Sequence, residues 1–112
     1  MFFGVIMHFH GVIVPMVTPF DEYGEVDYDA LRWLTDFLVR NGVHGLFPYS
    51  TTGEFVHLTI DEGLKIVETV LEVADEKVWI LPGISANRTD TCIMLGKMMK
   101  DLGASGVIVT CL

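Results

Sequence analysis

The sequence has few cysteines and few basic residues. Its two cysteines, Cys92 and Cys111, form no CxxC pair and no disulfide framework, which favours a reducing compartment and a cytoplasmic location. Seven Lys and Arg stand against fifteen Asp and Glu, which gives a formal net charge of -8. An acidic chain attracts neither nucleic acid nor an anionic membrane. We therefore expect no partner of either kind.

The sequence also lacks nucleotide-binding signatures. No GxGxxG and no GxxxxGK[ST] occurs in it, which argues against a Rossmann or P-loop domain. Residues 2–20 carry no Lys, Arg, Asp or Glu and are long enough to be considered for a membrane span. Pro15, Pro19 and two glycines interrupt this run, and no basic segment precedes it as in a signal peptide. We expect no membrane insertion.

The N-terminal residues 1–10 form an apolar leader, and residues 11–112 form one domain. Met7 is an alternative start to Met1. His8 and His10 would share one face of an extended segment, but the neighbouring sequence offers too few further ligands for a metal site. We expect no metal and no cofactor.

Apolar runs alternate with helical patterns along the domain. Four runs without polar alternation predict buried strands at 11–17, 45–47, 78–81 and 106–110. The helices between them have their own start and stop signals. The first helix starts at Asp27 and stops at Asn41-Gly42. The second starts at the capping box Thr59 to Glu62 and stops at Ala74-Asp75-Glu76. The third starts at Asn87 or Thr89 and stops at Gly103.

Apolar residues at helical spacing predict which face of each helix is buried. In the first helix the predicted buried face consists of Leu31, Leu34, Phe37 and Leu38. In the second it consists of Leu64, Val67 and Leu71, and in the third of Leu95, Met98, Met99 and Leu102. Strands buried on both faces and alternating with helices predict an α/β fold with a parallel sheet. Right-handed crossovers leave two arrangements, an open doubly wound sheet or part of a barrel.

The stretch Tyr49-Ser50-Thr51-Thr52-Gly53-Glu54 follows the second predicted strand. The hydroxyls of Thr51 and Thr52 and the nearby backbone N–H groups can donate to an anion. Gly53 has no Cβ to keep a ligand from the main chain. The stretch is therefore a candidate carboxylate site, and a plain polar turn is the alternative.

Several ordered motifs resemble those of the dihydrodipicolinate synthase / N-acetylneuraminate lyase family. This family of class I aldolases includes the 2-keto-3-deoxygluconate aldolases. The similarity runs in register from about Gly11 to Thr110. The motifs are Gly11-Val12-Ile13-Val14-Pro15-Met16-Val17-Thr18-Pro19-Phe20 with Gly24-Glu25-Val26-Asp27, Thr51-Thr52-Gly53-Glu54 with Leu58-Thr59 and Glu62, Pro82-Gly83 with Asn87-Arg88-Thr89, and Gly103-Ala104-Ser105-Gly106-Val107.

The resemblance implies a (β/α)₈ TIM barrel, of which this chain supplies about the first four strands and three helices. Members bind pyruvate or another 2-oxo acid on a lysine as a Schiff base. The resemblance implies that Thr51, Thr52 and Gly53 bind the carboxylate of the oxo acid. It also implies that Thr52 exchanges protons with a tyrosine, that Glu54 braces the loop, and that the protein is a homo-oligomer.

The sequence departs from the family at two places. Ser50 stands where members usually have glycine, and Cys111-Leu112 stands where they continue with Pro-Tyr. The resemblance places both the relay tyrosine and the Schiff-base lysine beyond the 112 residues, and none of Lys65, Lys77, Lys97 and Lys100 falls on a suitable strand. We therefore expect a truncated lyase that is inactive alone. The alternatives are a self-associating half-barrel remnant without catalysis, and a nucleotide or small-ligand binding module.

Overall fold

Short strands and longer helices alternate in the computed structural model, which describes residues 8–110. This order confirms the predicted α/β class. The elements are β1 (Ile13–Pro15), α1 (Tyr28–Arg40), β2 (Gly45–Phe47), a 3₁₀ turn η1 (Phe55–His57), α2 (Ile60–Ala74), β3 (Trp79–Ile80) and α3 (Thr89–Leu102).

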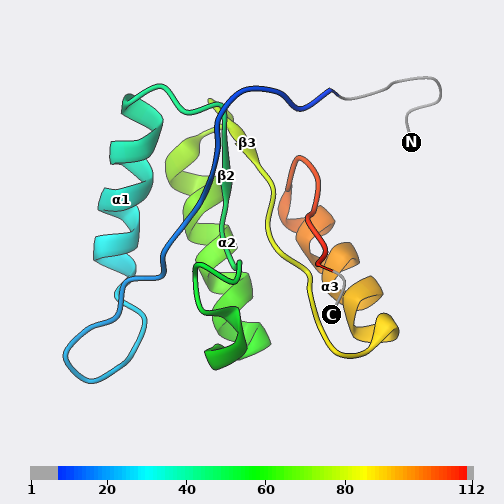
Figure 1. Ribbon diagram of the computed structural model, residues 1–112. Coiled ribbons are helices and arrows are strands. Elements are labelled where there is room, and N and C mark those ends of the chain that lie inside the picture. The colour runs from blue at the N-terminus through cyan, green and yellow to red at the C-terminus, as the bar shows by residue number, and fades with distance from the viewer. Residues whose placement is uncertain (1–7, 111–112) are drawn as a thin grey trace.

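The three strands form one parallel sheet in sequence order. Its strands are parallel and lie in the order β1-β2-β3, with Val14 opposite Leu46 and Leu46 opposite Ile80. Right-handed crossovers in one direction place all helices on the same face, and α1, α2 and α3 stand in a row in Figure 1. One half of a doubly wound sheet and the first part of a (β/α)₈ barrel share this strand order.

Local signals set the ends of the helices as predicted. The Asp27 side chain accepts from the Ala30 N–H at 3.0 Å, and the reciprocal bonds of the Thr59–Glu62 capping box are both formed. Gly42 and Gly103 have φ values of +85° and +106°. Glycine takes this left-handed conformation without a steric penalty, so it ends a helix readily.

The core consists of two apolar clusters between the sheet and the helices. The first joins β1, β2 and β3 to α1 and α2 through Met16, Leu31, Leu46, Ile66, Val70 and Ile80. The second joins α2 to α3 through Tyr49, Val67, Ile84, Leu95 and Met99. Two predicted core residues were wrong: Phe37 is 42% exposed and Met98 is 38% exposed. Each lies at the margin of its helix's apolar face, where the side chain is partly exposed to solvent.

The predicted fourth strand, residues 106–110, is reduced to a single parallel bridge between Gly83 and Ile108. Pro82 has no N–H and cannot donate to the preceding step of the ladder. On the other side, the Thr110 N–H donates to the Ser85 hydroxyl at 2.9 Å and not to a backbone carbonyl. The segment therefore lies beside the extension of β3 without forming a regular strand.

The described end of the predicted leader packs against the sheet. The Phe9 ring meets the Trp79 ring edge to face at a centroid distance of 5.1 Å, and His10 meets the same ring at 5.2 Å. The Val12 N–H donates to Nδ1 of His44 at 2.9 Å. Residues 8–10 thus lie at the N-terminal end of β3. The rest of the leader, including Met1 and Met7, lies outside the described residues.

Among residues 8–110, no helix combines the length and the apolar character that a membrane crossing requires.

Two helical glycines provide a matched test of the packing. A Cβ on Gly63 of α2 would lie 2.0 Å from Cε1 of the Tyr49 ring, whereas one on Gly96 of α3 would lie 3.6 Å from the nearest side chain, Ile84. We expect Gly63→Ala to lower the free energy of unfolding by about 1–3 kcal/mol because it overpacks the core. Gly96→Ala should raise it by about 0.5–1 kcal/mol, because alanine restricts the unfolded chain and favours the helix. Urea titration followed by circular dichroism measures both. Equal effects of the two variants would contradict the close seating of Tyr49.

Candidate functional site

The polar loop lies at the carboxyl ends of the parallel strands. Thr51 and Thr52 follow β2, Thr18 follows β1, and Ser85 follows β3. Because the strands are parallel, their carboxyl ends meet at one edge of the sheet. In (β/α)₈ barrels this edge carries the active site. The structure therefore places the predicted carboxylate-binding residues at the edge where ligands bind in this architecture.

Backbone geometry makes the loop a closed turn. Tyr49 and Glu54 bracket it with φ values of +58° and +59°. The Glu54 N–H donates to the Thr51 carbonyl at 3.0 Å, and the Phe55 N–H donates to the Ser50 carbonyl at 3.2 Å. A non-glycine residue with positive φ is strained, and two of them persist only where the surroundings hold them. The turn is therefore held in one shape by its neighbours.

Gly53 ties the loop to the end of β1. The Thr18 hydroxyl donates to the Gly53 carbonyl at 2.7 Å, in a buried bond that joins residues far apart in sequence. A Cβ on Gly53 would lie 2.9 Å from the Met16 carbonyl oxygen. The ends of β1 and β2 thus pack so closely that position 53 requires glycine. This requirement is separate from the predicted access of a ligand to the main chain.

Tyr49 anchors the other end of the loop. Its ring lies over Gly63, and its carbonyl oxygen would be 2.2 Å from a Cβ on Gly83. Burial, and then the charge of Glu62, raise the pKa of the Tyr49 phenol above its ordinary value. The phenol therefore stays protonated at neutral pH and acts as a structural side chain rather than a base.

Thr51 and Thr52 are exposed, in contrast to the buried Ser50 and Gly53 beside them. Within residues 8–110, neither the hydroxyls nor the backbone N–H groups of these two threonines donate to any acceptor. Together they offer four donors at the carboxyl edge of the sheet. Hydroxyl and amide donors of this kind suit a carboxylate.

A groove of about 540 Å³ adjoins Thr51. It lies between η1, the start of α2 and the loop that leads into α3. Its walls are mainly apolar, with polar groups from Ser85, Asn87 and Thr91. Of the carboxylate-binding candidates, Thr51 thus lines a pocket of the size that small ligands occupy.

The four lysines of the chain lie away from this edge. Lys65 is on α2 with its Nζ 4.1 Å from the centre of the Tyr28 ring. Lys97 and Lys100 are on α3, and Lys77 precedes β3 at its amino end. The predicted placement of the lysines on helices and before β3 is confirmed.

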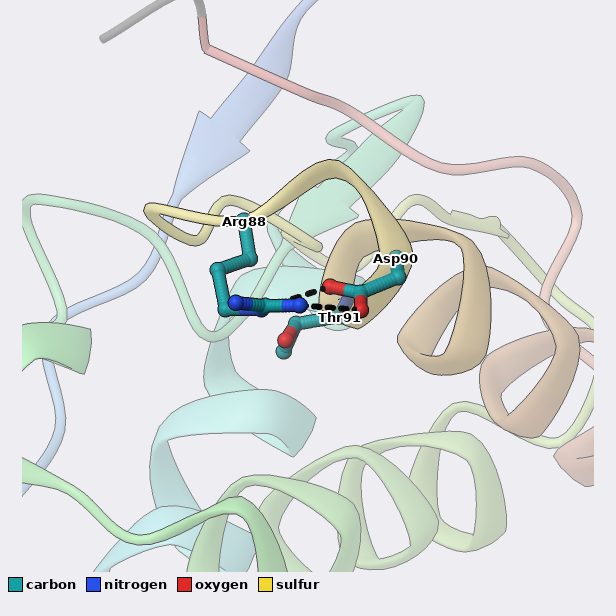
Figure 2. A network of polar contacts seen from close by, with 3 residues as sticks. All are labelled: Arg88, Asp90 and Thr91. Carbon is teal, nitrogen blue, oxygen red and sulfur yellow. Dashed lines mark hydrogen bonds and ion pairs between the residues drawn. The ribbon is translucent and has the colours of Figure 1, made fainter.

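The loop after β3 enters α3 through an ion pair (Figure 2). Arg88, in the N-cap position, donates to the Asp90 carboxylate from Nε at 3.0 Å and from Nη2 at 2.8 Å. The Thr91 N–H donates to the same carboxylate at 2.9 Å. The bond from Arg88 is the main cause that holds the pKa of Asp90 below its ordinary value. Helix α3 starts at Thr89, one of the two predicted starts.

No three His, Cys, Asp or Glu side chains lie close enough together to hold a metal ion in the part of the chain that the structure describes.

The sequence indicates the exposed pair of threonines but not Thr18, which bonds Gly53 of the loop, or Ser85, which lines the groove. Both are hydroxyl residues at the carboxyl end of a predicted parallel strand, and that shared position was a usable signal. The positive φ values of Tyr49 and Glu54 left no mark in the sequence.

Three parallel strands in sequence order with a polar loop at their carboxyl ends match the architecture of the N-terminal portion of a (β/α)₈-barrel enzyme. The model of the dihydrodipicolinate synthetase family matches residues 8–111, and the chain belongs to this family. A DapA-like lyase of Thermofilum pendens is 50% identical over 102 residues, which are 91% of this chain and 34% of the relative. The chain thus spans about a third of the length of the relatives it matches.

Solved structures agree with the fold. The dihydrodipicolinate synthase of Aquifex aeolicus superposes with a TM-score of 0.86 at 39% identity, over 90% of this chain and 34% of that one. YagE of E. coli K12, solved in complex with pyruvate, superposes with a TM-score of 0.85 at 32% identity, over 90% of this chain and 34% of that one. The predicted family and the predicted partial barrel are confirmed.

The Arg88–Asp90 pair can be tested by titration. Asp90 has a lowered pKa in the folded chain, so its contribution to stability is present above the ordinary value of 3.8 and is lost as the pH falls through the lower folded value. We expect Arg88→Gln to move the Asp90 pKa back towards 3.8. The carboxyl carbon shift of Asp90, followed by NMR from pH 2 to pH 6, reports this directly. Arg40→Gln, which removes a different exposed ion pair on α1, is the control and should leave Asp90 unchanged. An unmoved Asp90 titration in Arg88→Gln would show that the pair does not form in solution.

Proposed function

We propose that this chain supplies the carboxylate-binding part of a Schiff-base lyase or aldolase that acts on pyruvate or another 2-oxo acid in the cytoplasm. Family membership supports the reaction class, since the relatives include DapA-like lyases and 4-hydroxy-tetrahydrodipicolinate synthases. The complex of YagE with pyruvate supports the class of substrate. The observation that carries the proposal is the exposed Thr51–Thr52 pair, with its four free donors among residues 8–110 at the carboxyl edge of the sheet.

The proposed division of labour follows from chemistry. A lysine amine adds to the ketone carbon of the oxo acid, water leaves, and the protonated imine withdraws electrons from the neighbouring carbon. The carboxylate stays ionised throughout and needs fixed donors to orient the ketone. Thr51 and Thr52 belong to this second task, and Gly53 supports the turn that carries them. Thr52 is also the proposed proton-relay partner of a tyrosine, and Glu54 braces the loop.

The four lysines take no part in this scheme, because each is on an outer helix or at the amino end of β3. The expected result is a chain that binds pyruvate weakly and forms no imine by itself. Binding and covalent capture must therefore be measured separately.

Pyruvate binding tests the role of the threonines. We expect pyruvate to shift the NMR amide signals of Thr51 and Thr52. Thr51→Val and Thr52→Val should each weaken binding by about tenfold, the usual effect of losing a hydrogen bond to a charged group. Thr69→Val is the matched control, because Thr69 lies on α2 and its hydroxyl bonds the Lys65 carbonyl.

Treatment of the same sample with borohydride and pyruvate should leave all four lysines unmodified in peptide mass maps. An adduct on any of them, or unchanged binding in both variants, would contradict the proposal.

An exposed aromatic pair on α1 supports the proposed homo-oligomer. Trp33 and Phe37 stack on the outer surface of α1, with ring centroids 5.2 Å apart and planes at 11°. Trp33 is 62% exposed. The neighbouring Arg32 instead faces α2, where it binds Glu72. Exposed aromatic pairs of this kind are typical of surfaces that associate, and we propose that two copies of the chain meet here.

Sedimentation velocity over a concentration series tests this association. The double variant Trp33→Ser, Phe37→Ser should weaken self-association by roughly tenfold or more, because large aromatic side chains dominate interface energies. Tyr23→Ser removes another exposed aromatic, 82% accessible and outside α1, and should change nothing. A chain that is monomeric at every concentration would refute the proposal.

A further inference from the structure

Ser50 is the one hydroxyl residue of the loop that is buried, with 3% of its surface exposed. Its Oγ accepts a hydrogen bond from the Gly53 N–H at 3.2 Å, across the turn that contains Thr51 and Thr52. Its own carbonyl accepts from the Phe55 N–H at 3.2 Å. Ser50 therefore closes the turn from the inside with both its side chain and its main chain.

Gly53 is fixed from two directions as a result. Ser50 holds its N–H and Thr18 holds its carbonyl oxygen. Both bonds are buried, so water does not compete for them, and a buried polar group that loses its partner is costly. The peptide units on either side of Gly53 cannot turn without breaking one of these bonds.

This arrangement changes the donors available to a ligand. The Gly53 N–H points inward to Ser50 and is not free, whereas the N–H groups and hydroxyls of Thr51 and Thr52 have no acceptor within residues 8–110. A carboxylate at this edge is therefore held by the two threonines, and Gly53 serves as their fixed base.

We propose that Ser50 is a positioning residue for the binding of the 2-oxo acid carboxylate: its hydroxyl takes the Gly53 N–H out of the site and holds the Thr51–Thr52 turn in the binding shape. The inference rests on the proposed function and adds a residue that touches no substrate. A preorganised turn binds more tightly because the cost of ordering it has already been met in folding.

The chain offers a matched control. Ser105 makes the same kind of bond, with its Oγ accepting the Ile80 N–H at 3.0 Å, but it follows α3 and bonds β3 instead of the Thr51–Thr52 turn. Ser50→Ala and Ser105→Ala each remove one serine acceptor from a backbone N–H. They should reduce stability to a similar degree, while only Ser50→Ala should affect pyruvate binding.

The experiment combines amide hydrogen exchange with pyruvate titration by NMR on the 112-residue chain. In Ser50→Ala we expect the Gly53 amide to exchange at least about tenfold faster and pyruvate to bind about three- to tenfold more weakly, as the loss of one buried hydrogen bond implies. Ser50→Thr keeps the hydroxyl and should restore both properties. Ser50→Gly removes the hydroxyl with no added atoms and provides the same test if Ser50→Ala does not fold.

The outcomes separate this inference from the function on which it rests. Unchanged pyruvate affinity in Ser50→Ala and Ser50→Gly would overturn the role of Ser50 and leave the proposed function standing. Equal weakening by Ser105→Ala would also overturn it, because the effect would then follow stability alone. If pyruvate shifts no signal in the unsubstituted chain, the proposed function fails and the inference fails with it, whatever the exchange rate of Gly53.

Discussion

The seating of Tyr49 is the constraint on which the loop depends. Its ring occupies the space beside Gly63 on α2, and its carbonyl reaches the main chain at Gly83 after β3. One residue thereby connects the end of β2 with the next helix and the next strand. Its backbone has a positive φ of +58°. Such a conformation is unfavourable in isolation and is maintained here because the surrounding core leaves no other place for the ring.

From this anchor the rest of the site follows. The chain leaves Tyr49 into a turn whose inner side is buried and whose outer side carries two threonines. Thr18 donates to the Gly53 carbonyl oxygen, and Ser50 accepts from the Gly53 N–H. Both bonds are buried, so the exposed donors of Thr51 and Thr52 lie on a rigid support. A binding group on a rigid support is typical of barrel enzymes, in which the scaffold positions loops at the carboxyl ends of the strands.

Much of the fold could be predicted because its signals are local. Asp27, the Thr59–Glu62 box and Gly103 act within a few residues of their own positions, and all three set helix ends as predicted. The candidate site was predictable in part, since adjacent hydroxyls after an apolar run are visible in the sequence. The exposure of Phe37 was not, because helical spacing gives the direction of a side chain but not the element that it meets.

By itself, the sequence determined the alternation of strands and helices, the helix ends, the family and the position of the threonine pair. Each of these depends on residue types at short and fixed spacing. Only the tertiary structure decided the order of the strands, the bond between Thr18 and Gly53 across 35 positions, and the reduction of the fourth strand to one bridge. These depend on which distant segments pack against one another, and no local pattern of residues determines that.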